Sequence, residues 1–211
     1  MYSGDRPTIG GTSPSPFNPG PWQIAHWIVL PPPVVTIASA LSEEETKAAA
    51  EYFASMKFPH FYKVVETDMA PKSFVGAGAM RFAAKEGGTE PIGNRIIEIP
   101  ADEERTEARD PRAQHIAYVP TGSVKKGEMI VTTGAGGKTV ACAVCHGAEL
   151  KGLGEVPPIV GRSPEYIYRQ LNDIKIGART GLWTPLMKGV VDKLDETDMI
   201  AIAAYLASKE P

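Results

Sequence analysis

The chain has two cysteines, Cys142 and Cys145, and His146 follows the second of them directly. Cys-x-x-Cys-His is the pattern of a c-type haem attachment site. Two thiols at this spacing can form thioethers with the two vinyl groups of one porphyrin, and the next imidazole then falls under the iron. The pattern therefore predicts one covalently bound haem c, with His146 as a metal ligand.

Two other chemistries use similar residues. A redox-active Cys-x-x-Cys usually follows a strand in a βαβ pattern, whereas a glycine-rich run at residues 133–137 precedes the motif here. A structural zinc site needs four closely spaced ligands, and the remaining histidines, His26, His60 and His115, are scattered along the chain. A chance match is the third alternative, and the surrounding sequence favours haem.

Composition sets broad limits on the class of protein. A length of 211 residues with 43% hydrophobic residues is ordinary for one globular domain with extensions, or for two small domains. A net charge of −3 with interspersed signs gives no indication of nucleic acid or an anionic membrane as partner. The 21 glycines and 19 prolines predict many turns and little sheet. The most apolar stretch, residues 24–38, is too short to span a bilayer, so no transmembrane segment is expected.

Residues 123–211 have the pattern of a small helical domain. Ser123 is expected to cap a first helix. Ser163 and Pro164 predict the start of a second helix, and a third with an apolar stripe is expected from Asp195. The haem motif lies between the first two helices. A domain this small has little core of its own, and a buried porphyrin would add to it.

This region resembles a class I cytochrome c domain, which implies a role for each residue of the motif. Cys142 and Cys145 match the thioether cysteines, and His146 matches the proximal iron ligand. Pro158 matches the loop proline whose carbonyl accepts a hydrogen bond from the histidine Nδ1, with Pro157 as the adjacent alternative. That bond fixes the tautomer and orientation of the imidazole.

The same resemblance implies that Met187 is the distal iron ligand, on a loop just before the last helix. A thioether ligand raises the reduction potential relative to a second imidazole. Met129 and Met199 fall inside predicted helices and are expected to fill the core. Arg179 and Trp183 fall where the family often places donors to the haem propionates. Two further matches, at the crossing of the first and last helices, are Gly127 and Tyr205.

An internal repeat bears on the first half of the chain. Residues 41–55 align without gaps onto residues 194–208, the predicted last helix. Ser42 and Glu45 have the spacing of a capping box. Any alanine-rich capped helix shares some of these residues. The matches at both ends of the segment, however, are features of the terminal helix in class I cytochrome c domains. Gly4-Asp5-Arg6 echoes Gly177-Ala178-Arg179 in the same way.

The expected fold class is therefore mainly α, with a class I cytochrome c domain at the C-terminus. Residues 1–57 are interpreted as a partial or vestigial first cytochrome c-like domain, residues 58–122 as an irregular connecting segment, and residues 123–211 as the monohaem domain. The whole resembles the tandem two-haem bacterial cytochromes c, with the first haem motif absent. Either the first domain has decayed to a scaffold, or a separate or upstream polypeptide carries the missing half.

The middle of the chain has no haem motif. Residues 90–100 predict a short strand between turns, and the charged run at residues 102–112 predicts a solvated turn or loop. Residues 10–21, rich in glycine, proline and serine, are expected to be extended. Side chains that could contact a partner, although ordinary surface is the simpler interpretation, are His115, Tyr118, Arg105, Arg109 and Arg112.

These features predict an electron carrier, not an enzyme. The resemblance implies redox protein partners: a dehydrogenase, another cytochrome or a terminal oxidase. The expected docking patch surrounds the thioether edge at Ala143, Val144 and Gly147. Haem attachment predicts a periplasmic location or another one outside the cytoplasm, although no signal peptide is visible after Met1. Two alternatives remain: a haem enzyme or gas- or peroxide-binding protein with an open sixth position, and a structural cytochrome subunit of a larger complex.

Overall fold

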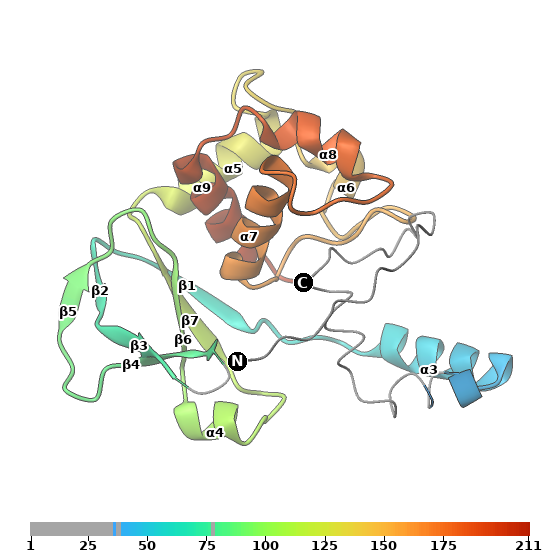
Figure 1. Ribbon diagram of the computed structural model, residues 1–211, viewed down its shortest axis with the longest axis horizontal. Coiled ribbons are helices and arrows are strands. Elements are labelled where there is room, and N and C mark those ends of the chain that lie inside the picture. The colour runs from blue at the N-terminus through green and yellow to red at the C-terminus, as the bar shows by residue number, and fades with distance from the viewer. Residues whose placement is uncertain (1–35, 37–38, 77–78) are drawn as a thin grey trace, which may run out of the picture.

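A computed structural model describes residues 36, 39–76 and 79–211 (Figure 1). The predictions at Gly4-Asp5-Arg6 and at residues 10–21 lie outside the described residues. The described chain forms an isolated helix, a region of short strands at residues 61–119, here called the β unit, and a helical region at residues 123–211, here called the C-terminal unit.

The C-terminal unit is helical, as the sequence predicts. Its core is a single cluster of buried side chains that draws on most of these helices and includes Ile130, Ile167, Leu194 and Leu206. The helices are α5 (Ser123–Thr133), α6 (Ala143–His146), α7 (Pro164–Lys175), α8 (Thr184–Val191) and α9 (Glu196–Ala207).

Two of the three predicted helix starts in this unit agree with the structure. Ser163 caps α7 by accepting a hydrogen bond from the Tyr166 amide, and Asp195 caps α9. The prediction for α5 is wrong, because its N-cap is Gly122 and Ser123 is the buried first residue of the helix. Gly122 has a φ of +85°, a conformation that a residue with a side chain adopts only with strain.

The closest helix contact joins α5 to α9. A Cβ atom added at Gly127 would lie 1.9 Å from the Ala201 carbonyl oxygen and 2.8 Å from Tyr205 Cβ. Only a residue without a side chain allows the two backbones to approach this closely. The predicted crossing of Gly127 and Tyr205 is therefore present in the structure.

Residues 58–122 are not an irregular segment. The predicted strand within residues 90–100 is found at its two ends, as β5 and β6, but the scarcity of sheet predicted from composition does not hold here. Strands β1, β7 and β6 form one sheet in that order, with β1 and β7 parallel, and two short hairpin-like pairs extend from it. The elements are β1 (Tyr62–Glu66), β2 (Met69–Pro71), β3 (Ser73–Val75), β4 (Arg81–Ala83), β5 (Thr89–Pro91), β6 (Ile97–Pro100), α4 (Glu103–Glu107) and β7 (His115–Val119).

Alternation of buried and less buried side chains explains why strands form in a region where the composition predicts little sheet. In β6, Ile97 and Ile99 are 2% and 6% exposed, whereas Glu98 between them points the other way. The two isoleucines join Ala70 and Ile92 in a second small core. The charged run at residues 102–112 contains the short helix α4, which Asp102 caps, and Arg105 and Arg112 form ion pairs with Asp102 and Asp110.

The β unit packs against the C-terminal unit through the last helix. Helix α9 contacts β1 and β7, and His60 Nε2 donates a hydrogen bond to the Ala207 carbonyl at 2.8 Å. Ser163 at the start of α7 donates to Glu98 on β6 at 2.7 Å. Burial raises the pKa of Glu98 to about 7, against the lowering effect of the Ser163 hydrogen bond. The two units therefore share a partly buried polar junction.

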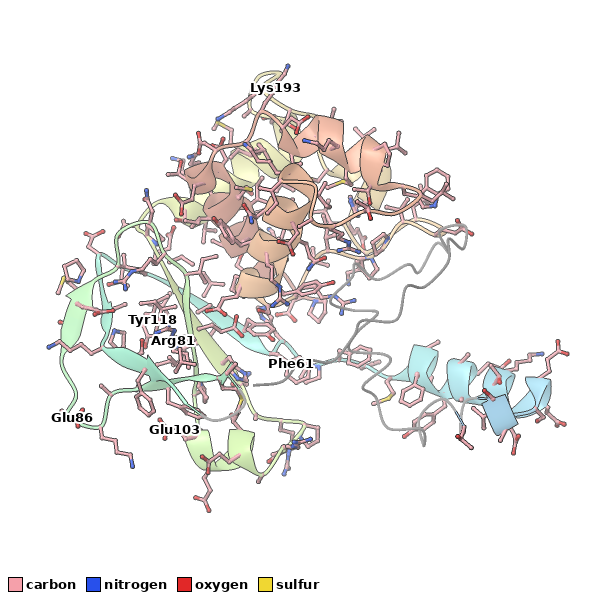
Figure 2. The ribbon with its side chains drawn as sticks, viewed as in Figure 1. Phe61, Arg81, Glu86, Glu103, Tyr118 and Lys193 are labelled. Atoms are coloured by element: carbon pink, nitrogen blue, oxygen red, sulfur yellow. The ribbon has the colours of Figure 1, made fainter. Side chains whose placement is uncertain are left out.

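Helix α3 (Glu43–Ser55) stands apart from both units. Figure 1 shows it extending away from the sheets and helices, and Figure 2 shows Phe61 where the chain passes from α3 into the β unit. The predicted capping box of Ser42 and Glu45 is present, but none of the residues in α3 is buried. The helix predicted by the repeat therefore exists, without a core of its own.

Candidate haem-binding site

A short helical turn brings the motif residues together. Cys142 is the N-cap of α6, and its carbonyl accepts a hydrogen bond from the His146 amide at 2.9 Å. Cys142, Cys145 and His146 stand at helical positions i, i+3 and i+4, which share one face. The Cys142 amide in turn donates to the Val131 carbonyl at 2.9 Å, so the motif is fixed to the last turn of α5.

The surroundings of the two thiols bear on the choice between haem attachment, a redox disulfide and a zinc site. Both cysteines are free, with Cys142 half-buried and Cys145 exposed. Burial raises the pKa of the Cys142 thiol to about 11, whereas the attacking thiol of a redox Cys-x-x-Cys has a lowered pKa. The described residues also contain no cluster of three or more His, Cys, Asp or Glu that could hold a metal ion. The raised pKa of Cys142 disfavours the redox-disulfide alternative.

The imidazole of His146 is oriented by one hydrogen bond. His146 is 8% exposed, and its Nδ1 lies 2.8 Å from the Pro157 carbonyl oxygen. Because a carbonyl can only accept, Nδ1 carries a proton, and in the neutral ring Nε2 then keeps its lone pair, as a metal ligand requires. The acceptor is Pro157, the adjacent alternative, and not Pro158 as first predicted.

The loop that holds Pro157 is tied back to the motif. The Gly152 amide donates to the His146 carbonyl at 2.9 Å, and the Ile159 amide donates to the Leu150 carbonyl at 3.0 Å. Leu150 is 6% exposed within the main core. Packing of this loop therefore places the carbonyl that orients the imidazole.

Met187 lies in helix α8 and not on a loop as the sequence predicts, because α8 begins at Thr184 with Pro185 in its first turn. Its side chain is half-buried and packs on the same core cluster as Cys142 and Ala143. Helix α8 still precedes the last helix, and its contacts with α7 fix its position.

Arg179 and Trp183 occupy the connection between α7 and α8. Arg179 is exposed and its backbone amide donates to the Asp173 carbonyl at 2.9 Å. Trp183 is the N-cap of α8, and its side chain is 57% exposed. Both side chains are accessible, and no described hydrogen bond holds either of them in a fixed direction.

Large apolar side chains are exposed in the segments that carry these residues. Val144, between the two cysteines, is 69% exposed, and Leu186, next to Met187, is 67% exposed. A contiguous patch of exposed apolar side chains commonly marks a ligand or partner surface, whereas single exposed ones are ordinary. Others in the same segments are Leu153, Ile176 and Leu182.

The residues fit a c-type haem. The motif supplies two unpaired thiols on one face of a helical turn, and the Nδ1 hydrogen bond of the adjacent imidazole leaves Nε2 of the neutral ring available to a metal. A thioether sulfur lies on the same core cluster. Imidazole and thioether are the axial donors of c-type cytochromes.

Comparisons with known proteins identify the family of this region. The family model described as Cytochrome c matches residues 124–210. Cytochrome c-554(548) of Halomonas halodenitrificans is 32% identical over 74 residues, which cover 35% of this chain and 89% of that protein. Cytochrome c4 of Pseudomonas aeruginosa is 36% identical over 74 residues, or 35% of each chain. A thiosulfate dehydrogenase electron acceptor of Thiomonas intermedia is 35% identical over 96 residues, or 44% of each chain.

The chain belongs to the cytochrome c family, as a class I c-type cytochrome. Membership implies covalently bound haem c and a part in electron transport. The aligned region spans 35% of the length of the cytochrome c4 from Pseudomonas aeruginosa and 44% of the Thiomonas intermedia protein. A solved cytochrome c4 of Acidithiobacillus ferrooxidans, 30% identical, covers 42% of this chain and 50% of its own with a TM-score of 0.39.

Sequence reasoning missed the charged group that joins α5 to α9. Asp198 is 3% exposed and pairs with Lys126 Nζ at 3.0 Å and with Lys138. Burial raises the pKa of Asp198, but the hydrogen bonds from the two lysines outweigh it and the net pKa is lowered. The available signal was the Asp195–Asp198 spacing, which is that of a capping box.

Proposed function

We propose that this chain transfers electrons through one haem c, bound covalently by Cys142 and Cys145, with His146 and Met187 as axial iron ligands. The observation that carries the proposal is the hydrogen bond from His146 Nδ1 to the Pro157 carbonyl, beside two unpaired thiols. It selects the tautomer in which Nε2 can bind a metal.

Each residue of the motif has a separate task. A haem c bound here supplies a one-electron couple at its iron. Pro157 holds the His146 ring in place and increases the basicity of Nε2. The half-buried Cys142 remains a neutral thiol until it is alkylated, because its pKa is about 11.

Met187 is the proposed distal ligand, and α8 holds it against the core. Thioether ligation keeps the sixth position filled, which excludes exogenous ligands and raises the reduction potential. Arg179 and Trp183 are the proposed donors to the propionates, since both are exposed in the connection that leads into α8.

The proposed docking surface is the exposed apolar group around Val144, which extends to Ala143 and Gly147. Electron-transfer contacts are small and transient, so a modest patch is sufficient. Relatives carry the names thiosulfate dehydrogenase electron acceptor and cytochrome subunit of sulfide dehydrogenase. We propose redox proteins of the periplasm as partners: a dehydrogenase, another cytochrome or a terminal oxidase. No described helix is long and apolar enough to cross a bilayer.

The reduced pyridine haemochrome spectrum, with protein concentration measured in parallel, tests the cofactor. The proposal predicts one haem per chain and a spectrum of two thioether bonds. Acid–acetone extraction should leave the pigment on the polypeptide, and Cys142→Ala should change the spectrum to that of one thioether. Release of pigment from the wild-type chain would contradict covalent attachment.

Met187→Ala tests the distal ligand. Loss of the thioether should lower the reduction potential and open the sixth position, so that the reduced protein binds carbon monoxide rapidly. Met129→Ala is the matched control, because Met129 is 51% exposed on α5 and does not fill the core as the sequence predicts. An unchanged spectrum and potential in Met187→Ala would refute the assignment, and carbon monoxide binding to the wild type would favour the open-site alternative.

A further inference from the structure

Helix α3 has a surface that matches the buried face of α9. Both helices begin with a capping box in the structure, formed by Ser42 with Glu45 and by Asp195 with Asp198. The aligned residues at the α5 crossing are identical in type, since Ala48 aligns with Ala201 and Tyr52 with Tyr205. The resemblance therefore extends from sequence to local geometry.

The aligned residues of the two helices differ strongly in how far they are buried. Tyr205 is 6% exposed, whereas Tyr52 is 64% exposed, and Phe53 is 61% exposed where Leu206 is 2% exposed. A helix of 13 residues is marginal in water without tertiary contacts. Burial of Tyr52 and Phe53 would supply those contacts.

The pattern of charge shows that only one side of α3 is adapted for contact. In α9, Ile200 and Ala204 are buried but lie outside the main core. The aligned residues of α3 are Lys47 and Glu51, which form an exposed ion pair at 3.9 Å. That side of α3 suits water, so the apolar side with Ala48 and Tyr52 is the contact surface.

The α5–α9 pair indicates the chemistry of the missing partner. Ala201 and Tyr205 accommodate Gly127, and Lys126, directly before it, pairs with Asp198 at 3.0 Å. In α3, Glu45 stands at the position of Asp198 and supplies the same charge. A lysine followed by glycine on a crossing helix would complement Glu45 and Ala48 together.

We propose that the face of α3 formed by Glu45, Ala48, Tyr52 and Phe53 is a docking surface for the first helix of a second cytochrome c half-domain. The occupant has a glycine at the crossing and a lysine directly before it. The inference rests on membership of the cytochrome c family and on the repeat. It is independent of the ligands proposed for the haem, so either proposal can fail alone.

Hydrogen exchange on the full haem-loaded chain tests the surface, with a synthetic peptide of residues 121–134 as the probe because it contains Lys126 and Gly127. The peptide should slow amide exchange in α3 roughly tenfold and leave α9 unchanged. Peptides with Gly127→Leu or Lys126→Glu should lose the effect. On the chain, Ala48→Arg should abolish the response, whereas Lys47→Ala on the opposite side should keep it.

Three results would overturn the proposal. One is an α3 that exchanges at the same rate with and without the peptide, or that responds equally to the Gly127→Leu peptide. Another is protection of α3 in the chain alone at every concentration, which would mean that the chain already covers it. The third is protection that grows with chain concentration, which would identify a second copy as the occupant.

Discussion

Helices α3 and α9 show how one sequence pattern leads to two structural outcomes. They align without gaps and start with the same capping arrangement, yet α9 buries ten of its 12 residues and α3 buries none. The difference lies in the partners. Helix α9 lies between α5, α7 and the β unit, whereas α3 has no extensive contact with any other element that the structure describes and buries none of its residues. Local sequence therefore determines that a helix forms, and the rest of the chain determines whether it is covered.

The partners of α9 also differ from one another. On one side, Gly127 of α5 allows backbone contact, so that interface is tight and specific in shape. On the other side lies a polar junction, in which His60, directly before the β unit, and Glu98 of the β unit form hydrogen bonds to the ends of α9 and α7. The first interface belongs to the cytochrome c domain itself, and the second couples the domain to the β unit.

A larger side chain at the α5 crossing should give the largest effect. Gly127→Leu would place its Cβ 1.9 Å from the Ala201 carbonyl oxygen, so the helices must separate. The expected loss in free energy of unfolding is about 3 kcal/mol or more, measured by urea denaturation. The matched change on α3, Ala48→Leu, should alter stability by less than about 0.5 kcal/mol. Equal losses in the two variants would show that α3 is already packed.

The second pair of variants removes one residue from each capping box. Asp198→Ala deletes the acceptor for the Asp195 amide and leaves Lys126 and Lys138 without their shared carboxylate. The expected cost is about 2 kcal/mol in the free energy of unfolding. Glu45→Ala removes an exposed cap from α3, so it should reduce helical circular dichroism slightly and leave the main unfolding transition unchanged. A shift of that transition in Glu45→Ala would break the contrast between the helices.

Much of the C-terminal unit could be predicted from the sequence, because its signals are local. Caps at Ser163 and Asp195, the helical spacing of apolar residues and the Cys-x-x-Cys-His motif each act within a few residues. The error at Ser123 has the same origin, since the glycine before it adopts the left-handed cap conformation. The helical position of Met187 was missed because Pro185, although compatible with a first turn, also suits a loop.

The β unit could not be predicted, because its strands depend on distant partners. Strand β1 pairs with β7, more than fifty residues later, and strands of three to five residues have almost no signal of their own. The choice between Pro157 and Pro158 likewise depends on how the loop packs around Leu150. Long-range packing decided each of these features.

The smallest predicted effect concerns the junction of the β unit with the C-terminal unit. Burial raises the pKa of Glu98 to about 7, and the groups around it are Ser163, Tyr62 and Glu165. Between about pH 4.5 and pH 7 the folded chain holds a proton that the unfolded chain has lost, so the free energy of unfolding falls as the pH rises. The full shift corresponds to about 3 kcal/mol, which partial exposure reduces to roughly 1–2 kcal/mol.

Glu98→Gln should remove this pH dependence, because the amide keeps the shape of the protonated carboxyl and can still accept from Ser163. Urea denaturation at pH 5 and pH 8 measures the difference between wild type and variant. Glu86→Gln is the control, since Glu86 lies on the exposed connection between β4 and β5 (Figure 2). A wild type and a Glu98→Gln variant that lose stability in parallel would mean that the carboxyl is solvated. The junction between β6 and the start of α7 would then be open to water, and only the contacts of α9 with β1 and β7 would remain as a buried interface between the two units.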